Sequence, residues 1–407
     1  MNLYIVFVIL ICISATFAYI NQKFIKIPFV IGLFLLSTII TLLVLSIRLF
    51  IPQPYVGLKE LVEHTDISGF ILNVMLGFLL FAGSLHTNWL HIREQLKKIT
   101  LLAIAGVLIS TVVIAILFYG ASLLIHIKID FIYCLLFGAL ISPTDPVAVL
   151  GILTKAGVPK KIESVIVGES LFNDGVGVVV FIALLETAQS GGNTFSFSHF
   201  GMLFLKEAAG GILFGLIAGY LLHFIINKID NYETEVLLTI AFVMGGYAAA
   251  LALHISGPLA MVVMGLLLGN YKSHTTMSNT SKEYVYKFWE VIDVILNALL
   301  FIIIATVLIV IDFKPSYFLI AVISVFIVFI SRVIVVYLPK IIAPKTFNID
   351  NSEAKLLVWG GLRGGLSIAL VLSLPESNEK YIILLATYCC VVFSILVQGL
   401  TIKKLIK

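Results

Sequence analysis

The chain has 407 residues, of which 60% are hydrophobic and only 12% charged, with a formal net charge of +4 and a mean hydropathy of +1.13. About 25% of the residues of a typical soluble domain are charged, so this composition excludes a soluble protein of this length. We therefore predict an all-α polytopic membrane protein in which a single membrane domain takes up residues 1–407.

Apolar runs of about 17–25 residues mark membrane-spanning helices, because a helix of about 20 residues crosses the hydrocarbon core. Only the short segment 401–407 follows the last such run, so we expect no soluble regulatory domain. The sequence predicts about thirteen spans, at 2–20, 27–49, 67–88, 99–125, 131–154, 162–186, 201–227, 235–254, 257–271, 290–311, 315–338, 354–373 and 380–401.

The lysines and arginines divide unevenly between alternate loops. If the N-terminus lies outside, most of the 26 basic residues fall on the inner side, as the positive-inside rule requires. Residues 3–18 resemble the apolar core of a signal peptide, but Lys23 and Lys26 follow them rather than precede them. We therefore predict a first spanning helix and a multi-pass protein of the cell membrane, with its N-terminus outside and its C-terminus in the cytoplasm.

Span 131–154 contains the sequence Ser-Pro-Thr-Asp-Pro at 142–146. Each proline removes a backbone donor and clashes with the preceding turn, so we predict that the helix breaks there. A break frees carbonyl and amide groups that can bind ions where they face protein or water. A plain proline kink is the alternative, but Thr144 and Asp145 between the prolines favour an ion site.

Near its middle, span 162–186 carries two carboxylates, Glu169 and Asp174, in an otherwise apolar stretch. A charge at this depth costs roughly 3 kcal/mol on insertion scales, so we expect it to serve a function. Residues four apart share a helix face, which places Glu169 near Asn173 and Ser170 near Asp174. Glu169 and Asp174 are five residues apart, so we expect them to face different partners.

Span 354–373 contains Gly-Gly-Leu-Arg-Gly-Gly at 360–365. Each glycine weakens a helix by about 1 kcal/mol relative to alanine, so we predict a second broken helix, with close helix packing as the alternative. Arg363 is buried in this span, and a buried guanidinium requires an anion. We assign Glu169 as its partner, which leaves Asp174 available; the alternative is that Asp174 also belongs to a structural ion network.

The two interrupted spans are an odd number of helices apart, so they cross the membrane in opposite directions. Paired broken helices of this kind indicate an inverted repeat with an ion site between the halves. We predict a first repeat at about 1–186, a linker helix at about 201–227 and a second repeat at about 235–401.

A lone carboxylate at Asp174 can hold a proton or a cation, but not both. Ser170, Thr144 and the carbonyls freed by the broken span offer the oxygen ligands that a hard cation prefers. Competition for one carboxylate, together with alternating access, is sufficient for cation/proton exchange. Because Asn173 is neutral, the site holds one mobile charge, which predicts electroneutral exchange of one cation for one proton.

Glu290, Asp293 and Asn297 lie at the predicted start of span 290–311. They could form an ion funnel at the inner mouth of the protein. We favour the other interpretation, in which acidic residues at a helix start are stabilised by the helix dipole.

Two other classes of protein deserve comparison. An intramembrane hydrolase with Ser170 or Thr144 as nucleophile needs a base within reach, but the histidines of this chain lie near span ends. A cation channel is a closer alternative, although channels are usually built from a pore ring with an open path. We therefore expect a transporter rather than an enzyme, with no cofactor, no nucleic-acid partner and no metal other than the transported cation.

These motifs together resemble the NhaP-type branch of the cation:proton antiporters, relatives of the Na⁺/H⁺ exchangers. The matching sequences are Thr-Asp-Pro at 144–146, Gly-Glu-Ser with Asn-Asp at 168–174, Gly-Pro-Leu-Ala with Gly-Leu-Leu-Leu-Gly-Asn at 257–270, and the glycine-rich segment at 360–365. The resemblance implies a thirteen-helix homodimer with a dimerisation domain and a mobile six-helix core. It also implies exchange of Na⁺, or alternatively of Li⁺ or K⁺, for H⁺ across the lipid bilayer.

The resemblance further implies roles for single residues. Asp174 would carry the cation or proton, supported by Asn173, with Thr144 and Ser170 as further cation ligands. Glu169 would pair with Arg363, and Asp145 would stabilise the ends of the broken helices at their crossing. One residue departs from the pattern, because Ala82 stands where several archaeal NhaP proteins carry a glutamate. A carboxylate contribution from this span to the site is therefore in doubt.

Overall fold

The computed structural model describes residues 3–47, 66–145, 153, 158–189, 197–270, 278–309, 315–345 and 347–405. Within these ranges the regular structure is entirely helical, as predicted. The α-helices are α1 Leu3–Ile20, α2 Phe29–Ile47, α4 Ile67–Phe70, α5 Leu76–Leu85, α6 Trp89–Thr100, α7 Val107–Leu124, α8 Phe131–Ile141, α10 Lys160–Gln189, α11 Phe197–Ile226, α12 Tyr232–Ala252, α13 Gly257–Asn270, α14 Asn279–Thr306, α15 Pro315–Ile342, α16 Asn351–Trp359, α17 Gly365–Leu372, α18 Asn378–Val392 and α19 Gly399–Thr401. Single π-helical stretches join α4 to α5, α6 to α7 and α18 to α19.

Among the described residues, 10 helical stretches are long and apolar enough to cross a membrane. The helices α8 and α13 are apolar but shorter. The predicted span 354–373 is divided, because α16 ends at Trp359 and α17 begins at Gly365. The coarse prediction of an all-helical membrane protein is therefore confirmed, while the predicted end of span 131–154, including Pro146, lies outside the described residues.

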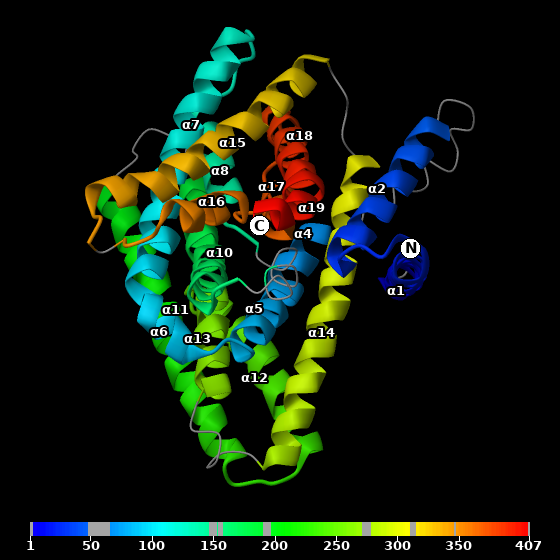
Figure 1. Ribbon diagram of the computed structural model, residues 1–407, viewed down its shortest axis with the longest axis vertical. Helices are drawn as coiled ribbons and strands as arrows, with labels where there is room; N and C mark the ends of the chain where they lie inside the picture. The colour runs from blue at the N-terminus through cyan, green and yellow to red at the C-terminus, as the bar shows by residue number, and fades with distance from the viewer. Residues whose placement is uncertain are drawn as a thin grey trace.

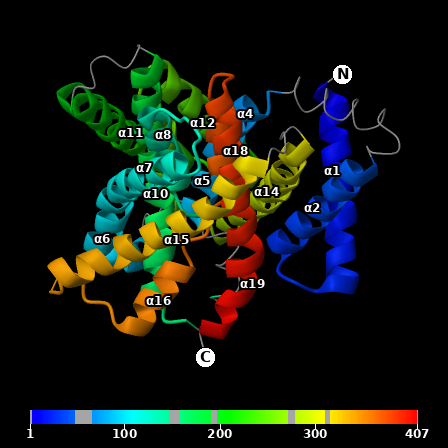
Figure 2. The same cartoon turned by 90° about the horizontal axis from the view of Figure 1, so that it is seen from above.

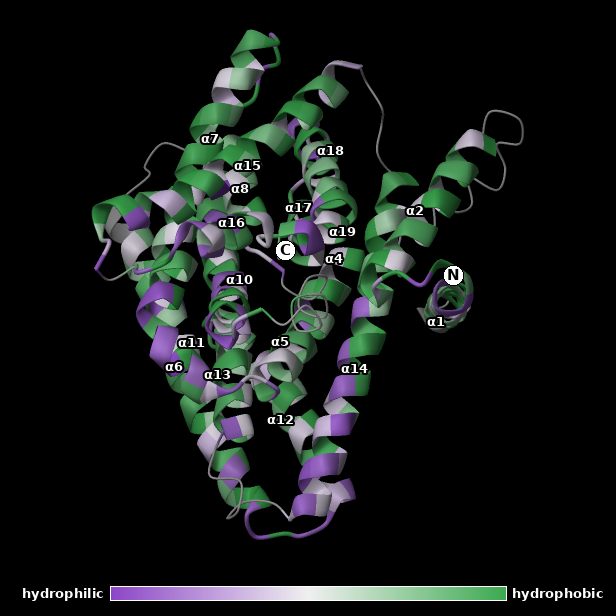
Figure 3. Ribbon diagram, viewed as in Figure 1, coloured by the Kyte–Doolittle hydropathy of each residue, from purple (hydrophilic) through white to green (hydrophobic). Residues whose placement is uncertain are grey.

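Two helices begin about ten residues earlier than predicted. The helix α6 begins at Trp89 and α14 at Asn279, and Asn88 and Ser278 cap them by accepting hydrogen bonds from backbone N–H groups. Their first turns are polar, so a hydropathy criterion alone excluded them. Figure 3 shows these hydrophilic stretches along α6 and the first half of α14.

The helix α10 lies in the interior of the molecule. It packs mainly against α6 and α8, while α14 packs mainly against α2 and α5. In two perpendicular views, α1 and α2 lie at one edge with α14 beside them, and α6 and α7 lie on the other side of α5 and α10 (Figures 1 and 2). The helices α10 and α14 therefore belong to different packing groups.

Two non-helical segments, 142–145 and 360–364, lie against each other in the interior. The backbone N–H of Asp145 donates to the carbonyl of Leu362 at 2.8 Å, which ties the segments together. A Cβ at Gly364 would overlap the Asp145 carboxylate, so this close approach requires glycine. The crossing therefore places the ends of α8, α16 and α17 beside the middle of α10.

Candidate functional site

A cavity of about 580 Å³ lies between α10 and α14. Its wall includes α5, the segment 143–145, α10, α14 and the start of α17. Four of the residues that the sequence singled out line it: Thr144, Asp145, Ser170 and Asp174. The structure thus gathers predicted site residues from two segments of the chain, 144–145 and 170–174, around one cavity.

One face of α10 follows this cavity for most of its depth. The lining residues of α10 recur every three or four positions, as the period of an α-helix requires, and are Lys160, Glu163, Ser164, Val167, Ser170, Leu171 and Asp174. Asp174 is half-buried. Glu169 and Asn173 are 2% and 1% exposed and do not line the cavity. Glu169 and Asp174 therefore have separate surroundings on the same helix.

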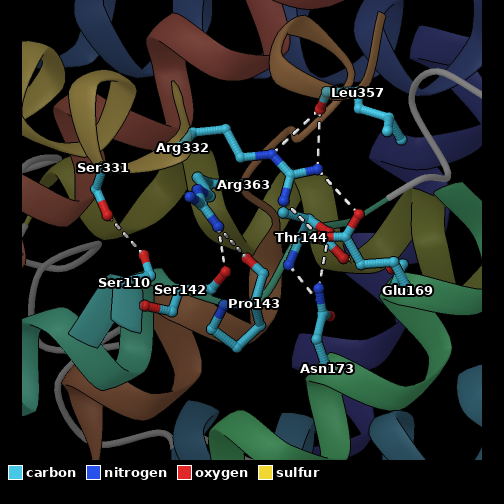
Figure 4. A network of polar contacts seen from close by, with 11 residues as sticks. Ser110, Ser142, Pro143, Thr144, Glu169, Asn173, Ser331, Arg332, Leu357 and Arg363 are labelled. Atoms are coloured by element: carbon cyan, nitrogen blue, oxygen red, sulfur yellow. Dashed lines mark hydrogen bonds and ion pairs between the residues drawn. The ribbon is translucent and has the colours of Figure 1, made fainter. Parts of the chain in front are cut away.

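The predicted pairing of Glu169 with Arg363 is wrong, because Glu169 pairs with Arg332 of α15 (Figure 4). Arg332 donates from Nη1 to Oε1 and from Nη2 to Oε2, the second bond measuring 3.0 Å. Its Nε and Nη2 also donate to the carbonyl of Leu357, at 3.1 and 2.9 Å. Both members of the pair are buried, so this bidentate contact neutralises both charges within the protein.

The sequence contained a signal for Arg332, because the predicted span 315–338 includes this basic residue. In the structure it lies within α15, on the face that also buries Ser331 and Val335. Ser331 in turn shares a hydrogen bond of 3.0 Å with Ser110 of α7, so the buried face of α15 is polar at this level.

Arg363 bonds to backbone rather than to a carboxylate. Its Nη1 donates to the carbonyl of Ser142 and, at 3.0 Å, to that of Pro143. These carbonyls lie just beyond the end of α8, where helix carbonyls have no intrahelical partner. A cation at this position satisfies them, and it joins the segment 360–364 to the segment 142–145 a second time (Figure 4).

Asn173 and Ser170 hold Thr144 from three directions. The Oδ1 of Asn173 accepts from the backbone N–H of Thr144 at 3.3 Å, and its Nδ2 donates to Thr144 Oγ1 at 2.9 Å. The hydroxyl of Ser170 donates to the carbonyl of Thr144. Both hydroxyls have oxygen lone pairs remaining beside the cavity. The non-helical segment is thus fixed to α10 immediately beside Asp174.

Asp174 differs from these neighbours. No hydrogen bond or ion pair to its carboxylate is found among the described parts of the chain, although the charge of Asp145 is near enough to interact with it. A carboxylate in this position can take up a cation or a proton from the cavity without first breaking an internal bond.

The wall opposite α10 carries Glu290, Asp293, Asn297 and Leu300 of α14. The interpretation of the acidic pair as helix-start residues is wrong, because α14 begins at Asn279, about three turns earlier. A spacing of three, four and three residues describes one continuous helix face. This spacing was the signal that could have identified the wall.

The helix α5 contributes no carboxylate to the cavity. Its lining residues are Leu76, Leu79, Leu80 and Gly83. Ala82, the residue that departs from the archaeal pattern, is fully buried and does not line the space. At the mouth, His86 and His91 line the cavity together with the first turn of α10.

Comparison with known proteins identifies the relatives of this chain. The profile of the family described as "Sodium/hydrogen exchanger, transmembrane" matches residues 11–407. The Na⁺/H⁺ antiporter NhaP of Pseudomonas aeruginosa is 45% identical over 403 residues, covering 98% of this chain and 95% of the relative. The Na⁺/H⁺ antiporter NhaH of Halobacillus dabanensis is 36% identical over 360 residues, covering 87% and 85%.

A solved structure has the same fold. The sodium proton antiporter MjNhaP1 of Methanocaldococcus jannaschii superposes with a TM-score of 0.76 at 19% identity, covering 98% of this chain and 96% of that chain. The likeness extends over nearly the full length of both proteins. With the profile match and the identity to the bacterial relatives, it leads to one conclusion: this chain belongs to the transmembrane sodium/hydrogen exchanger family.

Proposed function

We propose that this protein is a secondary antiporter that exchanges Na⁺ for H⁺ by alternating access, and that Asp174 binds either ion. The observation that carries the proposal is the carboxylate of Asp174, which has no hydrogen-bond or ion-pair partner among the described residues and faces a cavity beside two hydroxyl groups, where the segments 142–145 and 360–364 cross. Family membership and relatives named as Na⁺/H⁺ antiporters support the same activity.

The oxygen atoms around Asp174 suit a hard monovalent cation. Ser170 and Thr144 line the cavity, and each hydroxyl oxygen keeps lone pairs beyond those used in its internal bonds. With the Asp174 carboxylate they offer the oxygen ligands that such a cation prefers. Na⁺ is the proposed substrate, and Li⁺ and K⁺ are alternatives that differ in size and in the cost of dehydration.

The other predicted residues position the site rather than carry the ion. Arg332 fixes Glu169, Asn173 fixes Thr144, and Arg363 fixes the carbonyl ends of α8. Asp145 lies at the crossing of the two segments, through its backbone bond to Leu362. These contacts hold the ligands in place before an ion arrives, which lowers the cost of binding.

The site has one exchangeable charge, because Asn173 is neutral and Glu169 is engaged by Arg332. We therefore propose electroneutral exchange of one cation for one proton. The measurement is the current across a voltage-clamped membrane during turnover. A current that scales with the transport rate would contradict this stoichiometry.

We further propose the architecture that accompanies this mechanism. Two repeats, about 1–186 and 235–401, are related by inversion, with about 201–227 as linker, and the two interrupted helices cross between them. The protein has thirteen spans, its N-terminus outside and its C-terminus in the cytoplasm, and it forms a homodimer. Cross-linking of the purified protein tests the dimer, and cysteine labelling from each side of the membrane tests the orientation.

The activity is tested with purified protein in liposomes that carry a proton gradient. Addition of Na⁺ is expected to dissipate the gradient in the wild type and to have no effect in Asp174→Asn. Glu283→Gln is the matched control, since it removes an exposed carboxylate that lies outside the cavity. Unchanged exchange in Asp174→Asn would overturn the mechanism, and proton-independent passage of Na⁺ would indicate a channel instead.

A further inference from the structure

The wall of the cavity opposite Asp174 is also acidic. On α14, Glu290, Asp293 and Asn297 share one face and line the cavity together. The sequence continues this face with Leu300, which packs against Gly365 at the start of α17. The face therefore runs from Glu290, at the mouth of the cavity, to the crossing of the segments 142–145 and 360–364. Its polar residues lie in the part of the cavity nearer the mouth.

Asn297 is the polar residue of this face that lies farthest from the mouth. It is 2% exposed, yet its side chain lines the cavity. Its Nδ2 donates to the backbone carbonyl of Asp293 at 2.9 Å, and its side chain also interacts with the Asp293 carboxyl group. An amide oxygen that lines a cavity can accept from water or bind a hard cation, so Asn297 adds a neutral oxygen ligand beside Asp293. This placement points to a ligand inside the cavity at the level of Asp293.

Charge interactions connect Asp293 with the crossing. The charge of Asp145 is near enough to interact with Asp293 on one side and with Asp174 on the other. Asp145 therefore adds negative charge near both carboxylates between which a cation would pass. Negative charge that lines a cleft with low-dielectric walls raises the local concentration of cations.

The two carboxylates belong to separate packing groups. Asp293 is on α14, which packs mainly against α2 and α5, whereas Asp174 is on α10, which packs mainly against α6 and α8. Any movement of one group against the other changes the distance between these two residues. A cation held on the α14 side could therefore be passed to α10 in one arrangement and be separated from it in another.

From these observations we propose that Asp293, with Asn297, forms a second cation site nearer the mouth, called the mouth-side site below, which takes a monovalent cation from the mouth and delivers it to Asp174. The proposal rests on the proposed antiport, and it adds a second carboxylate that contacts the transported ion. Glu290 contributes charge nearer the mouth. Asp174 remains the only group in this scheme at which the cation competes with the proton.

The test is the dependence of exchange on Na⁺ concentration in liposomes at fixed pH. Loss of one charge beside the path weakens the local attraction, so Asp293→Asn is expected to raise the apparent KM for Na⁺ about five-fold. The maximal rate is expected to stay within about two-fold of the wild type, because Asp174 still carries the ion. Asp293→Glu, which keeps the charge, is expected to restore the KM.

Controls separate this proposal from the antiport on which it rests. Glu283→Gln removes the same charge from the same helix outside the cavity and is expected to leave the KM unchanged. If the wild type does not exchange, or Asp174→Asn still does, the proposed function fails. If both behave as proposed and Asp293→Asn has the KM of the wild type, only the proposal of the mouth-side site fails.

Two further results would overturn the proposal of the mouth-side site. A fall in maximal rate at unchanged KM, or a failure of Asp293→Glu to restore the KM, would show that Asp293 acts through the structure rather than on the ion. If Asp293→Asn does not give monodisperse protein, Asp293→Ser replaces it with the same expected KM. A high concentration of impermeant salt is expected to reduce the difference between wild type and variant, because it screens the lost charge.

Discussion

Glu169 and Asp174 are the same kind of group on the same helix, and they have opposite surroundings. Glu169 is 2% exposed and accepts two hydrogen bonds from Arg332. Asp174 is half-buried, faces the cavity and has no hydrogen-bond or ion-pair partner among the described residues. A separation of five residues is enough to turn the two carboxylates toward different parts of the molecule.

A carboxylate within a membrane costs free energy, and these two residues show two reasons for which a protein can keep one. Glu169 neutralises a buried guanidinium and so holds α10 against α15 and the end of α16. Asp174 faces space that an ion can enter. The first residue should therefore matter for stability and the second for transport, and the following variants test that division.

The largest effect is expected from Glu169→Gln. This change leaves the Arg332 guanidinium buried without an anion, and breaking a buried pair in this way costs about 3–5 kcal/mol of unfolding free energy. The matched variant Asp174→Asn removes a carboxylate from the same helix without leaving an unpaired cation, so its stability should equal or exceed that of the wild type. Thermal and denaturant unfolding of both proteins in detergent measures the difference.

A double variant tests whether the loss of stability in Glu169→Gln comes from the unpaired guanidinium of Arg332. Glu169→Gln combined with Arg332→Gln removes both charges, so it should recover part of the stability lost in Glu169→Gln alone. Equal losses in Glu169→Gln and Asp174→Asn would show that the two carboxylates are not divided between stability and transport in the way that their contacts indicate.

A smaller effect is expected from Asn173→Ala. The change leaves the backbone N–H and the hydroxyl of Thr144 without their partners. A buried polar group left unpaired costs about 1–3 kcal/mol, and a looser Thr144 should also lower the exchange rate. Ser324→Ala is the control, because that buried hydroxyl donates to Ile320 of its own helix and does not line the cavity. Unfolding and exchange that are unchanged in Asn173→Ala would contradict the proposed positioning of Thr144.

A substitution at Gly364 tests the close approach between the segments 142–145 and 360–364, which lie beside Asp174. A methyl group at Gly364 would overlap the Asp145 carboxylate, so Gly364→Ala should force the two interrupted segments apart. Overpacking of this kind costs about 1–3 kcal/mol, and exchange should fall with it. Gly120→Ala in α7, where an added Cβ meets no atom within 4 Å, should be tolerated in both assays. Equal tolerance of the two substitutions would show that the close approach is unimportant.

Much of the site follows from local chemistry that a sequence displays. Prolines around Thr144 and glycines around Arg363 predict interruptions, because these residues disturb a helix wherever they occur. Helical periodicity likewise separates Glu169 from Asp174 without any knowledge of the neighbouring helices. The gathering of Thr144, Ser170 and Asp174 around one cavity agrees with those local signals.

The partner of Glu169 could not be predicted in this way. Arg332 is 163 residues away in the chain, and only the packing of α15 decides that it, rather than Arg363, reaches the carboxylate. The segment 142–145 supplies the partners of Arg363, since the carbonyls of Ser142 and Pro143 accept from the guanidinium, and only the packing of the two segments brings them together. The α14 wall was missed for another reason, because the polar first turns of that helix hid its true start at Asn279.

The smallest expected effect concerns His86 at the mouth of the cavity, beyond the end of α5. Burial lowers the pKa of His86 from its ordinary value of 6.5, and the charge of Glu290 offsets part of that effect. Below about pH 6.5 the unfolded chain therefore binds more protons at this residue than the folded protein, so the contribution of His86 to stability is lost as the pH falls through that range.

Melting temperatures between pH 7.5 and pH 5 measure the effect of His86. His86→Gln should lose less stability on acidification than the wild type, while the two should coincide near pH 7.5, where the imidazole is neutral in both states. Glu290→Gln should steepen the loss, since it removes the charge that favours protonated His86. Parallel curves for all three proteins would show that the mouth of the cavity does not discriminate against a protonated histidine. Glu290 on the wall of α14 supplies the charge that opposes the effect of burial on His86. This comparison therefore tests whether a carboxylate of α14 acts on a charged group at the mouth of the cavity.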